Sequence, residues 1–138
     1  VNLAKDYDNV NEGKLAALYA GNAYVNSGNF TDAKTYFDKA TGSDADLVQS
    51  GAFAGIALCN EEEGNFEQAA DNYKKAANKL NEDVLKSKYL YFAAISYEQA
   101  GNKDEAKKIF ESIVELNESS EFGNKSKVKL SMLGTKID

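Results

Sequence analysis

Apolar and small residues recur along this chain with a period of 36 to 37 residues. The segment Gly-Asn-Phe-Thr-Asp-Ala at 28–33 returns, with substitutions, at 64–69 and at 101–106. An aromatic residue follows each Ala by four positions, and apolar residues spaced by three, four or seven positions precede each Gly. Such spacings place apolar side chains on one face of a helix. The chain is therefore predicted to contain three units, each built as helix, tight turn and helix.

The three predicted turns share one local chemistry. Each begins with a glycine, which suits the left-handed conformation that ends many helices: Gly28, Gly64 and Gly101. Each glycine is followed by an asparagine, a favourable N-cap for the next helix: Asn29, Asn65 and Asn102. A capping box needs an acidic or amide residue three positions later, and these places hold Asp32, Gln68 and Glu105.

The packing between helices is also predicted by the pattern. The first helix of each unit carries a small residue that lets its partner approach closely: Gly21, Ala57 and Ala94. Aromatic residues are expected to fill the space between units: Tyr24, Phe37, Tyr73, Tyr97 and Phe110. Because no unit can bury its apolar face alone, the three units must stack.

This arrangement resembles the tetratricopeptide repeat (TPR), over roughly residues 14–116. The resemblance implies an all-α fold: a right-handed α-solenoid of three TPR units at about 14–41, 47–79 and 84–116, within a single domain at 1–138. An N-terminal helical segment and a C-terminal capping helix at about 119–134 complete it. The period exceeds the usual value of about 34 residues, and the Pro that normally follows the second helix is absent, so the superhelical twist should differ.

Composition and charge exclude several classes of function. The chain has no His, which removes the commonest general base and metal ligand, so we expect neither an enzyme nor a cofactor or metal. A net charge of −6 argues against nucleic-acid binding. No Lys or Arg lies between Lys39 and Lys74, whereas the C-terminal stretch is rich in Lys. This asymmetry reflects solubility and helix-end electrostatics, or else attraction between molecules or for a basic partner. The lone cysteine, Cys59, is expected to be buried.

In the TPR family the first helix of each unit lines a concave groove. In that register the candidate partner-binding residues are Tyr19, Asn22, Asn26, Gly51, Gly55, Leu58, Glu62, Lys88, Tyr91, Phe92 and Ile95, with Leu15, Leu18, Ala54 and Gln99 beside them. Their largely apolar character favours a protein or peptide partner with hydrophobic side chains. One TPR class captures chaperone C-termini with a carboxylate clamp, and only Asn22 and Lys88 match it. Carboxylate capture by that mechanism is therefore not expected.

Two glycines within one predicted helix, Gly51 and Gly55, need a reason because glycine costs about 1 kcal/mol against alanine there. Either they leave a bare strip on the groove floor for a ligand backbone, or they allow close packing against a neighbouring helix. The acidic runs at 61–63 and 44–46 are interpreted as solvated helix ends rather than metal sites.

Residues 7–24 are similar to bacterial envelope TPR proteins of the ancillary translocon-subunit type. That resemblance implies a periplasmic domain tethered by a membrane anchor that precedes Val1, with a chaperone-like role; otherwise a cytoplasmic location is expected. The leading hypothesis is a scaffold for protein–protein interaction. The alternative is a self-association module, in which the groove is filled by the protein's own N-terminal helix or by a second copy, giving a homo-oligomer.

Overall fold

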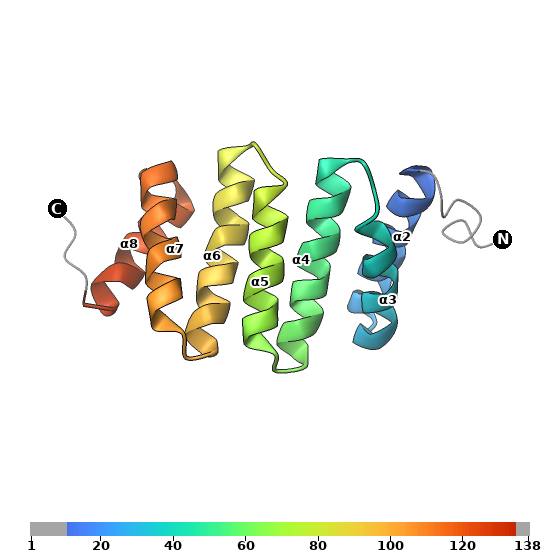
Figure 1. Ribbon diagram of the computed structural model, residues 1–138, viewed down its shortest axis with the longest axis horizontal. Helices are drawn as coiled ribbons and strands as arrows, with labels where there is room; N and C mark the ends of the chain where they lie inside the picture. Colours follow the sequence, from blue (N-terminus) through green and yellow to red (C-terminus); the bar gives the residue numbers. More distant parts are fainter. Residues whose placement is uncertain (1–10, 135–138) are drawn as a thin grey trace.

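A computed structural model describes residues 11–134, and within that range the chain folds into seven α-helices without a strand. Their bounds are α2 Asn11–Asn26, α3 Phe30–Ala40, α4 Asp46–Glu62, α5 Phe66–Asn78, α6 Asp83–Gln99, α7 Lys103–Leu116 and α8 Glu121–Met132. The helices stand side by side in chain order (Figure 1). The predicted all-α solenoid is therefore confirmed. The predicted N-terminal helical segment lies outside the described residues.

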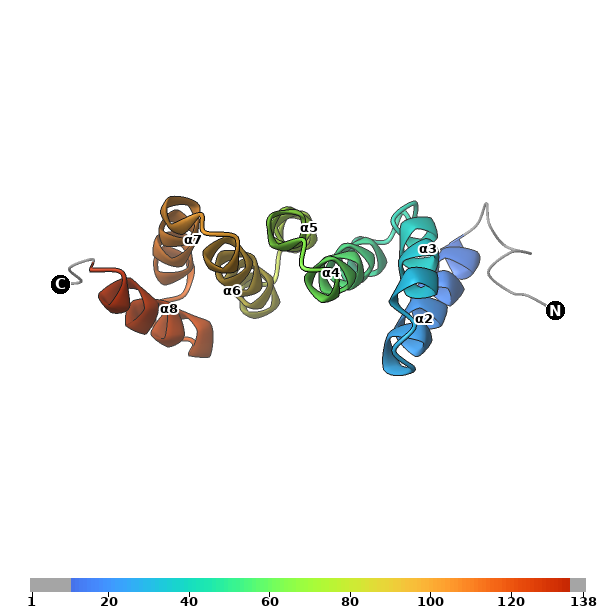
Figure 2. The same cartoon turned by 90° about the horizontal axis from the view of Figure 1, so that it is seen from below.

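The helices form two layers along the length of the molecule. Figure 2 shows α2, α4, α6 and α8 on one side and α3, α5 and α7 on the other. Each helix packs against its neighbours in the chain. The first helices of the three units, followed by α8, thus share one face.

The three tight turns adopt the predicted conformation. The φ angles of Gly28, Gly64 and Gly101 are 80°, 79° and 85°, in the left-handed region that favours glycine. The N–H group of the asparagine after each glycine donates at 2.8 Å to a carbonyl oxygen five residues earlier, as in the Schellman motif. This bond satisfies a carbonyl that the end of the helix would otherwise leave without a partner.

The predicted side-chain caps form in two of the three turns. The Asn29 side chain accepts from the Asp32 N–H group at 3.3 Å, and the Asn102 side chain accepts from the Glu105 N–H group at 3.4 Å. The Asn65 side chain makes no cap hydrogen bond, so that prediction was wrong for the second turn. The Asn65 backbone nevertheless has φ −90° and ψ 71°, close to the values of Asn29 and Asn102, and it shares with them the backbone hydrogen bond of the glycine turn.

The core contains most of the predicted aromatic and small residues, although Tyr24 is only half-buried and stacks on Tyr36. Phe37 and Phe110 are fully buried, and so are Ala57 and Ala94. A Cβ atom added to Gly21 would lie 2.5 Å from Phe37 Cε1, closer than real contacts allow, which explains the glycine there. The expectation that Cys59 is a buried thiol is confirmed, and burial is the main reason that its pKa is raised.

Helix α8 closes the C-terminal end of the stack. It packs against α7 and α6, and the Ser120 hydroxyl caps its first turn by accepting from the Gly123 N–H group at 3.0 Å. Leu130 is 3% exposed within the last hydrophobic cluster. An ion pair of 3.3 Å between Lys129 Nζ and Glu98 Oε1 joins α8 to α6. The helix therefore acts as the expected cap.

Candidate functional site: an apolar cleft between α4 and α6

The layer formed by α2, α4, α6 and α8 is not evenly packed. Helices α2 and α4 pack directly against each other, and so do α6 and α8, whereas α4 and α6 approach each other much less closely. Helix α5 lies behind the space between α4 and α6 in the opposite layer (Figure 2). Helices α4 and α6, the first helices of the second and third units, therefore form the walls of a cleft.

Two adjoining cavities of about 370 Å³ each occupy this cleft. Both are lined by Leu58 of α4, Phe92 of α6 and Tyr73 of α5, which forms the floor. The first cavity extends towards α2 and is also lined by Leu18, Asn22, Gly51, Ala54, Gly55, Lys88 and Tyr89. The second extends towards the C-terminal ends of α4 and α6 and is also lined by Glu61, Ile95 and Gln99. Together they make one groove, which we call the α4–α6 cleft.

Seven of the eleven candidate residues line the α4–α6 cleft: Asn22, Gly51, Gly55, Leu58, Lys88, Phe92 and Ile95. The other four line neither cavity. Tyr19 is 63% exposed on α2, and Asn26 and Glu62 are exposed at helix ends. The Tyr91 ring faces the C-terminal helices instead, with centroids 5.6 Å from Phe110 and 5.5 Å from Phe122.

The two glycines of α4 contact different neighbours. A Cβ atom on Gly55 would lie 2.5 Å from Phe37 Cζ, so this glycine makes room for the buried ring of α3. A Cβ atom on Gly51 would lie 3.4 Å from the Leu18 methyl groups, which is an ordinary contact. Close packing therefore explains Gly55. It does not by itself require a glycine at position 51, which lines the first cavity.

Three residues of the cleft were not predicted as site residues: Glu61, Tyr73 and Tyr89. Glu61 follows Leu58 by three positions on the same helix, so helical spacing could have indicated it. Tyr73 belongs to the second layer and was interpreted only as a core residue. Its ring packs edge-on against Phe92 with centroids 5.6 Å apart. Burial and the nearby Glu61 carboxylate raise the pKa of Tyr73, so its hydroxyl stays protonated at neutral pH.

The two ends of the cleft carry opposite charges. Lys88 Nζ lies 5.9 Å from the ring centroid of Phe92 and 6.0 Å from that of Tyr89. At the other end, the Ser96 hydroxyl donates to Glu61 Oε1 at 3.2 Å. Within residues 11–134, neither Lys88 nor Glu61 forms an ion pair with another side chain. Both charges therefore border an apolar cavity without a counter-ion from the described part of the protein.

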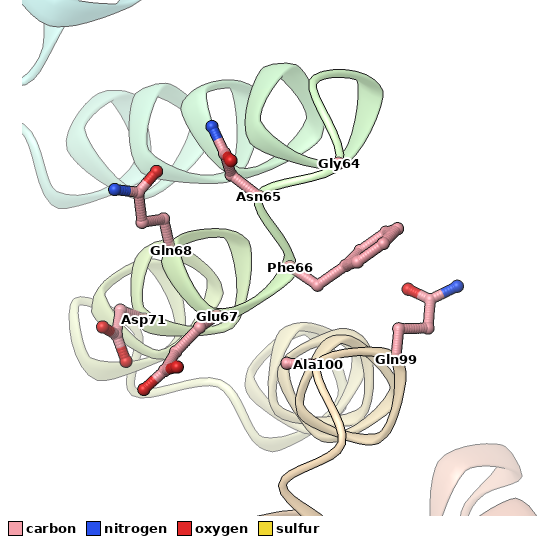
Figure 3. A pocket seen from close by; sticks show the side chains of 8 residues that line it. All are labelled: Gly64, Asn65, Phe66, Glu67, Gln68, Asp71, Gln99 and Ala100. Atoms are coloured by element: carbon pink, nitrogen blue, oxygen red, sulfur yellow. The ribbon is translucent and has the colours of Figure 1, made fainter.

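A larger hollow of about 660 Å³ lies where the turn between α4 and α5 meets the end of α6. Figure 3 shows its polar side chains pointing in different directions: Gln68 and Asn65 lie on one side, and Glu67 and Asp71 on another. Asp71 already accepts from the Tyr97 hydroxyl at 2.7 Å. Because these groups do not converge on one point, the hollow is a weaker candidate than the cleft. Within residues 11–134, no group of three or more carboxylate or thiol side chains is arranged so that it could hold a metal ion.

The stacked helix pairs, glycine turns and shared face define a tetratricopeptide-like α-solenoid. A family profile for Iml2/tetratricopeptide repeat protein 39 matches residues 3–132. The chain belongs to this family. No curated protein matches the chain. TPR-like repeats generally mediate protein–protein interactions, so the chain has the architecture of an interaction domain. No helix within the described range is long and apolar enough to span a bilayer.

Proposed function

We propose that this domain is a non-catalytic scaffold that holds a segment of a partner protein in the α4–α6 cleft. The observation that carries this proposal is the cleft itself. It is a solvent-open, mostly apolar groove between two helices whose neighbours on either side are closely packed. Concave apolar surface with a few polar groups at its ends is typical of binding sites. The absence of His from the sequence supports the view that the groove binds rather than catalyses.

A single substitution on the cleft wall tests the proposal. Leu58 lines both cavities and is only half-buried, so Leu58→Gln replaces an apolar contact while nearly keeping the size of the side chain. Leu47→Gln is the matched control, because Leu47 lies on the same helix, is 68% exposed and lines neither cavity. We would select binders from a displayed random-peptide library with the wild-type domain and measure the affinities of both variants by fluorescence anisotropy.

The expected result is a loss of about tenfold or more in peptide affinity for Leu58→Gln, since one well-buried interface side chain contributes on the order of 1–2 kcal/mol. Leu47→Gln should bind like the wild type. Circular dichroism would show that both variants are folded. Failure to enrich any peptide, or equal binding by both variants, would contradict the proposal.

Self-association is the second candidate function. The C-terminal cap exposes Val128 (61%) and Met132 (73%), apolar side chains that a second copy could cover. Light scattering on the purified domain would decide this. A dimer that becomes a monomer in Leu58→Gln would mean that a second copy fills the cleft, and a dimer that persists would place the contact elsewhere, as on the exposed side of α8. A monomer at all concentrations supports a different partner.

We also propose a chaperone-like role at the bacterial cell envelope, with the domain held in the periplasm by a membrane anchor. The resemblance of residues 7–24 to ancillary translocon-subunit proteins supports this location. The full-length gene product, tagged at its C-terminus, should fractionate with membranes and become sensitive to protease only once the periplasm is opened. Recovery in the soluble cytoplasmic fraction would refute this location.

A further inference from the structure

We propose that Glu61 makes the α4–α6 cleft selective for a partner segment in which a Lys or Arg side chain flanks apolar anchors at the Glu61 end. This inference rests on the proposed function and specifies the chemistry of the partner. Its basis is the position of one carboxylate relative to the apolar surface. Glu61 borders the same cavity as Leu58, Phe92 and Ile95. A ligand whose apolar side chains fill that cavity therefore brings its next residues beside the carboxylate.

The Glu61 carboxylate is held in place by its own surroundings. The buried Ser96 hydroxyl of the opposite wall donates to Oε1 at 3.2 Å. The Tyr73 hydroxyl on the cleft floor also interacts with Glu61, and this interaction, together with burial as the main cause, raises the pKa of Tyr73. A carboxylate fixed by hydroxyl donors loses less side-chain entropy when it forms an ion pair than a freely rotating one does.

The carboxylate also lacks a cationic partner in the described part of the protein. Glu98, on the same end of α6, is paired with Lys129, and Glu63 is paired with Lys34 at 3.4 Å. No comparable ion pair involves Glu61 within residues 11–134. Since the cleft has an apolar surface on one side, a charge there is screened less than a fully exposed one. A basic ligand group is therefore the complementary partner.

The opposite charge at the other end gives the ligand a direction. Lys88 lies eight residues before Ser96 on α6, and at about 1.5 Å per residue the two ends are about 12 Å apart. An extended segment of about four residues spans that distance. A basic group beside Lys88 would be repelled, so the basic residue should lie at the Glu61 end. The ligand is thus a short segment with apolar side chains in the middle and a Lys or Arg at one end.

The test uses peptides of about twelve residues, long enough to span the cleft with flanks on both sides. They are enriched by the wild-type domain from a random displayed library, and the best binder is synthesised with its basic residue intact and with that residue replaced by Gln. Both forms are titrated against the wild type and Glu61→Gln, which keeps the shape of the side chain and its acceptor oxygen. Glu111→Gln, on the exposed surface of α7, is the control for net charge.

The expected result is a coupled loss. Removing the basic residue should weaken binding to the wild type by about threefold to tenfold, as for an ion pair at a partly desolvated interface. The same peptide change should have little effect with Glu61→Gln, and Glu111→Gln should behave as the wild type.

Two outcomes would overturn the inference and can be told apart. Enriched peptides without a basic residue, or an equal loss in the wild type and Glu61→Gln, would remove the role of Glu61 while the groove remains a binding site. Peptides whose binding is unaffected by Leu58→Gln would instead refute the proposed function, and this inference with it.

Discussion

The two junctions between the three repeat units differ at a repeat position that faces the neighbouring unit, among other positions. At the first junction the aromatic residue of α3, Phe37, lies against Gly55 of the next unit. At the second junction the aromatic residue of α5, Tyr73, lies against Phe92, which is 37 positions after Gly55. With no side chain at position 55, α2 and α4 pack closely, whereas the Phe92 ring stands between α4 and α6. Gly55 therefore belongs to the junction that closes, and its counterpart Phe92 to the junction that leaves a cleft.

The difference shows how a repeat protein obtains a site without changing its fold. The turns, small residues and buried aromatic residues are nearly the same in each unit, because every unit must stack. The residues that face the concave side have no such constraint, so they can vary between units. Function is therefore expected where the repeats disagree, and stability where they agree.

The largest expected effect on stability comes from the first junction, where α2 and α4 pack closely. Phe37→Ala should lower the free energy of unfolding by about 3–5 kcal/mol, because the ring is fully buried and its removal leaves a cavity. Phe92→Ala should cost clearly less, since its ring is half-buried beside a solvent-open cleft. Urea denaturation of the two variants measures both values. Equal losses would mean that the second junction is as tightly packed as the first.

Substitution of the two glycines of α4 by alanine should change the stability of the fold by a smaller amount, and in opposite directions. Gly55→Ala should destabilise the fold by about 1–3 kcal/mol, because the new methyl group would lie 2.5 Å from the buried Phe37 ring. Gly51→Ala should stabilise it by up to about 1 kcal/mol, since alanine favours a helix and its Cβ would meet Leu18 at 3.4 Å. Thermal and urea unfolding would measure both changes. A gain in stability for Gly55→Ala would show that the first junction is packed loosely enough to accept the extra methyl group.

These comparisons also show what the sequence could predict. The helices, the glycine turns and the buried aromatic residues followed from periodicity and turn chemistry, which are local and repeat three times. Ten of the thirteen residues that line the cleft followed from the TPR register, Leu18, Ala54 and Gln99 among them. The register could not show that Tyr91 packs against Phe110 and Phe122, because this depends on where α8 lies. Nor could it place Glu61 beside Ser96, which is 35 positions later in the chain.

The smallest expected effect concerns the N-caps of α4 and α6, the two helices that form the walls of the cleft. The two N-caps differ. Helix α4 starts after Ala45, whose side chain makes no cap hydrogen bond, whereas α6 starts after Glu82, whose carboxylate accepts from the N–H groups of Val84 at 2.8 Å and Leu85 at 2.9 Å. These bonds favour the charged carboxylate and lower the pKa of Glu82 below its ordinary value of 4.5. The cap should therefore stabilise the folded state above pH 4.5, and its contribution should be lost as the pH falls through the lowered pKa.

Glu82→Gln tests this by removing the charge while keeping one acceptor oxygen. The variant should be slightly less stable than the wild type at neutral pH, and the difference should vanish in acid, where the wild-type carboxyl group is protonated as well. Urea midpoints measured at neutral pH and well below pH 4.5 would show the change, with Glu111→Gln as the control for charge on an exposed helix surface. A difference that persists in acid would mean that the shape of the Glu82 side chain, rather than its charge, fixes the start of this wall.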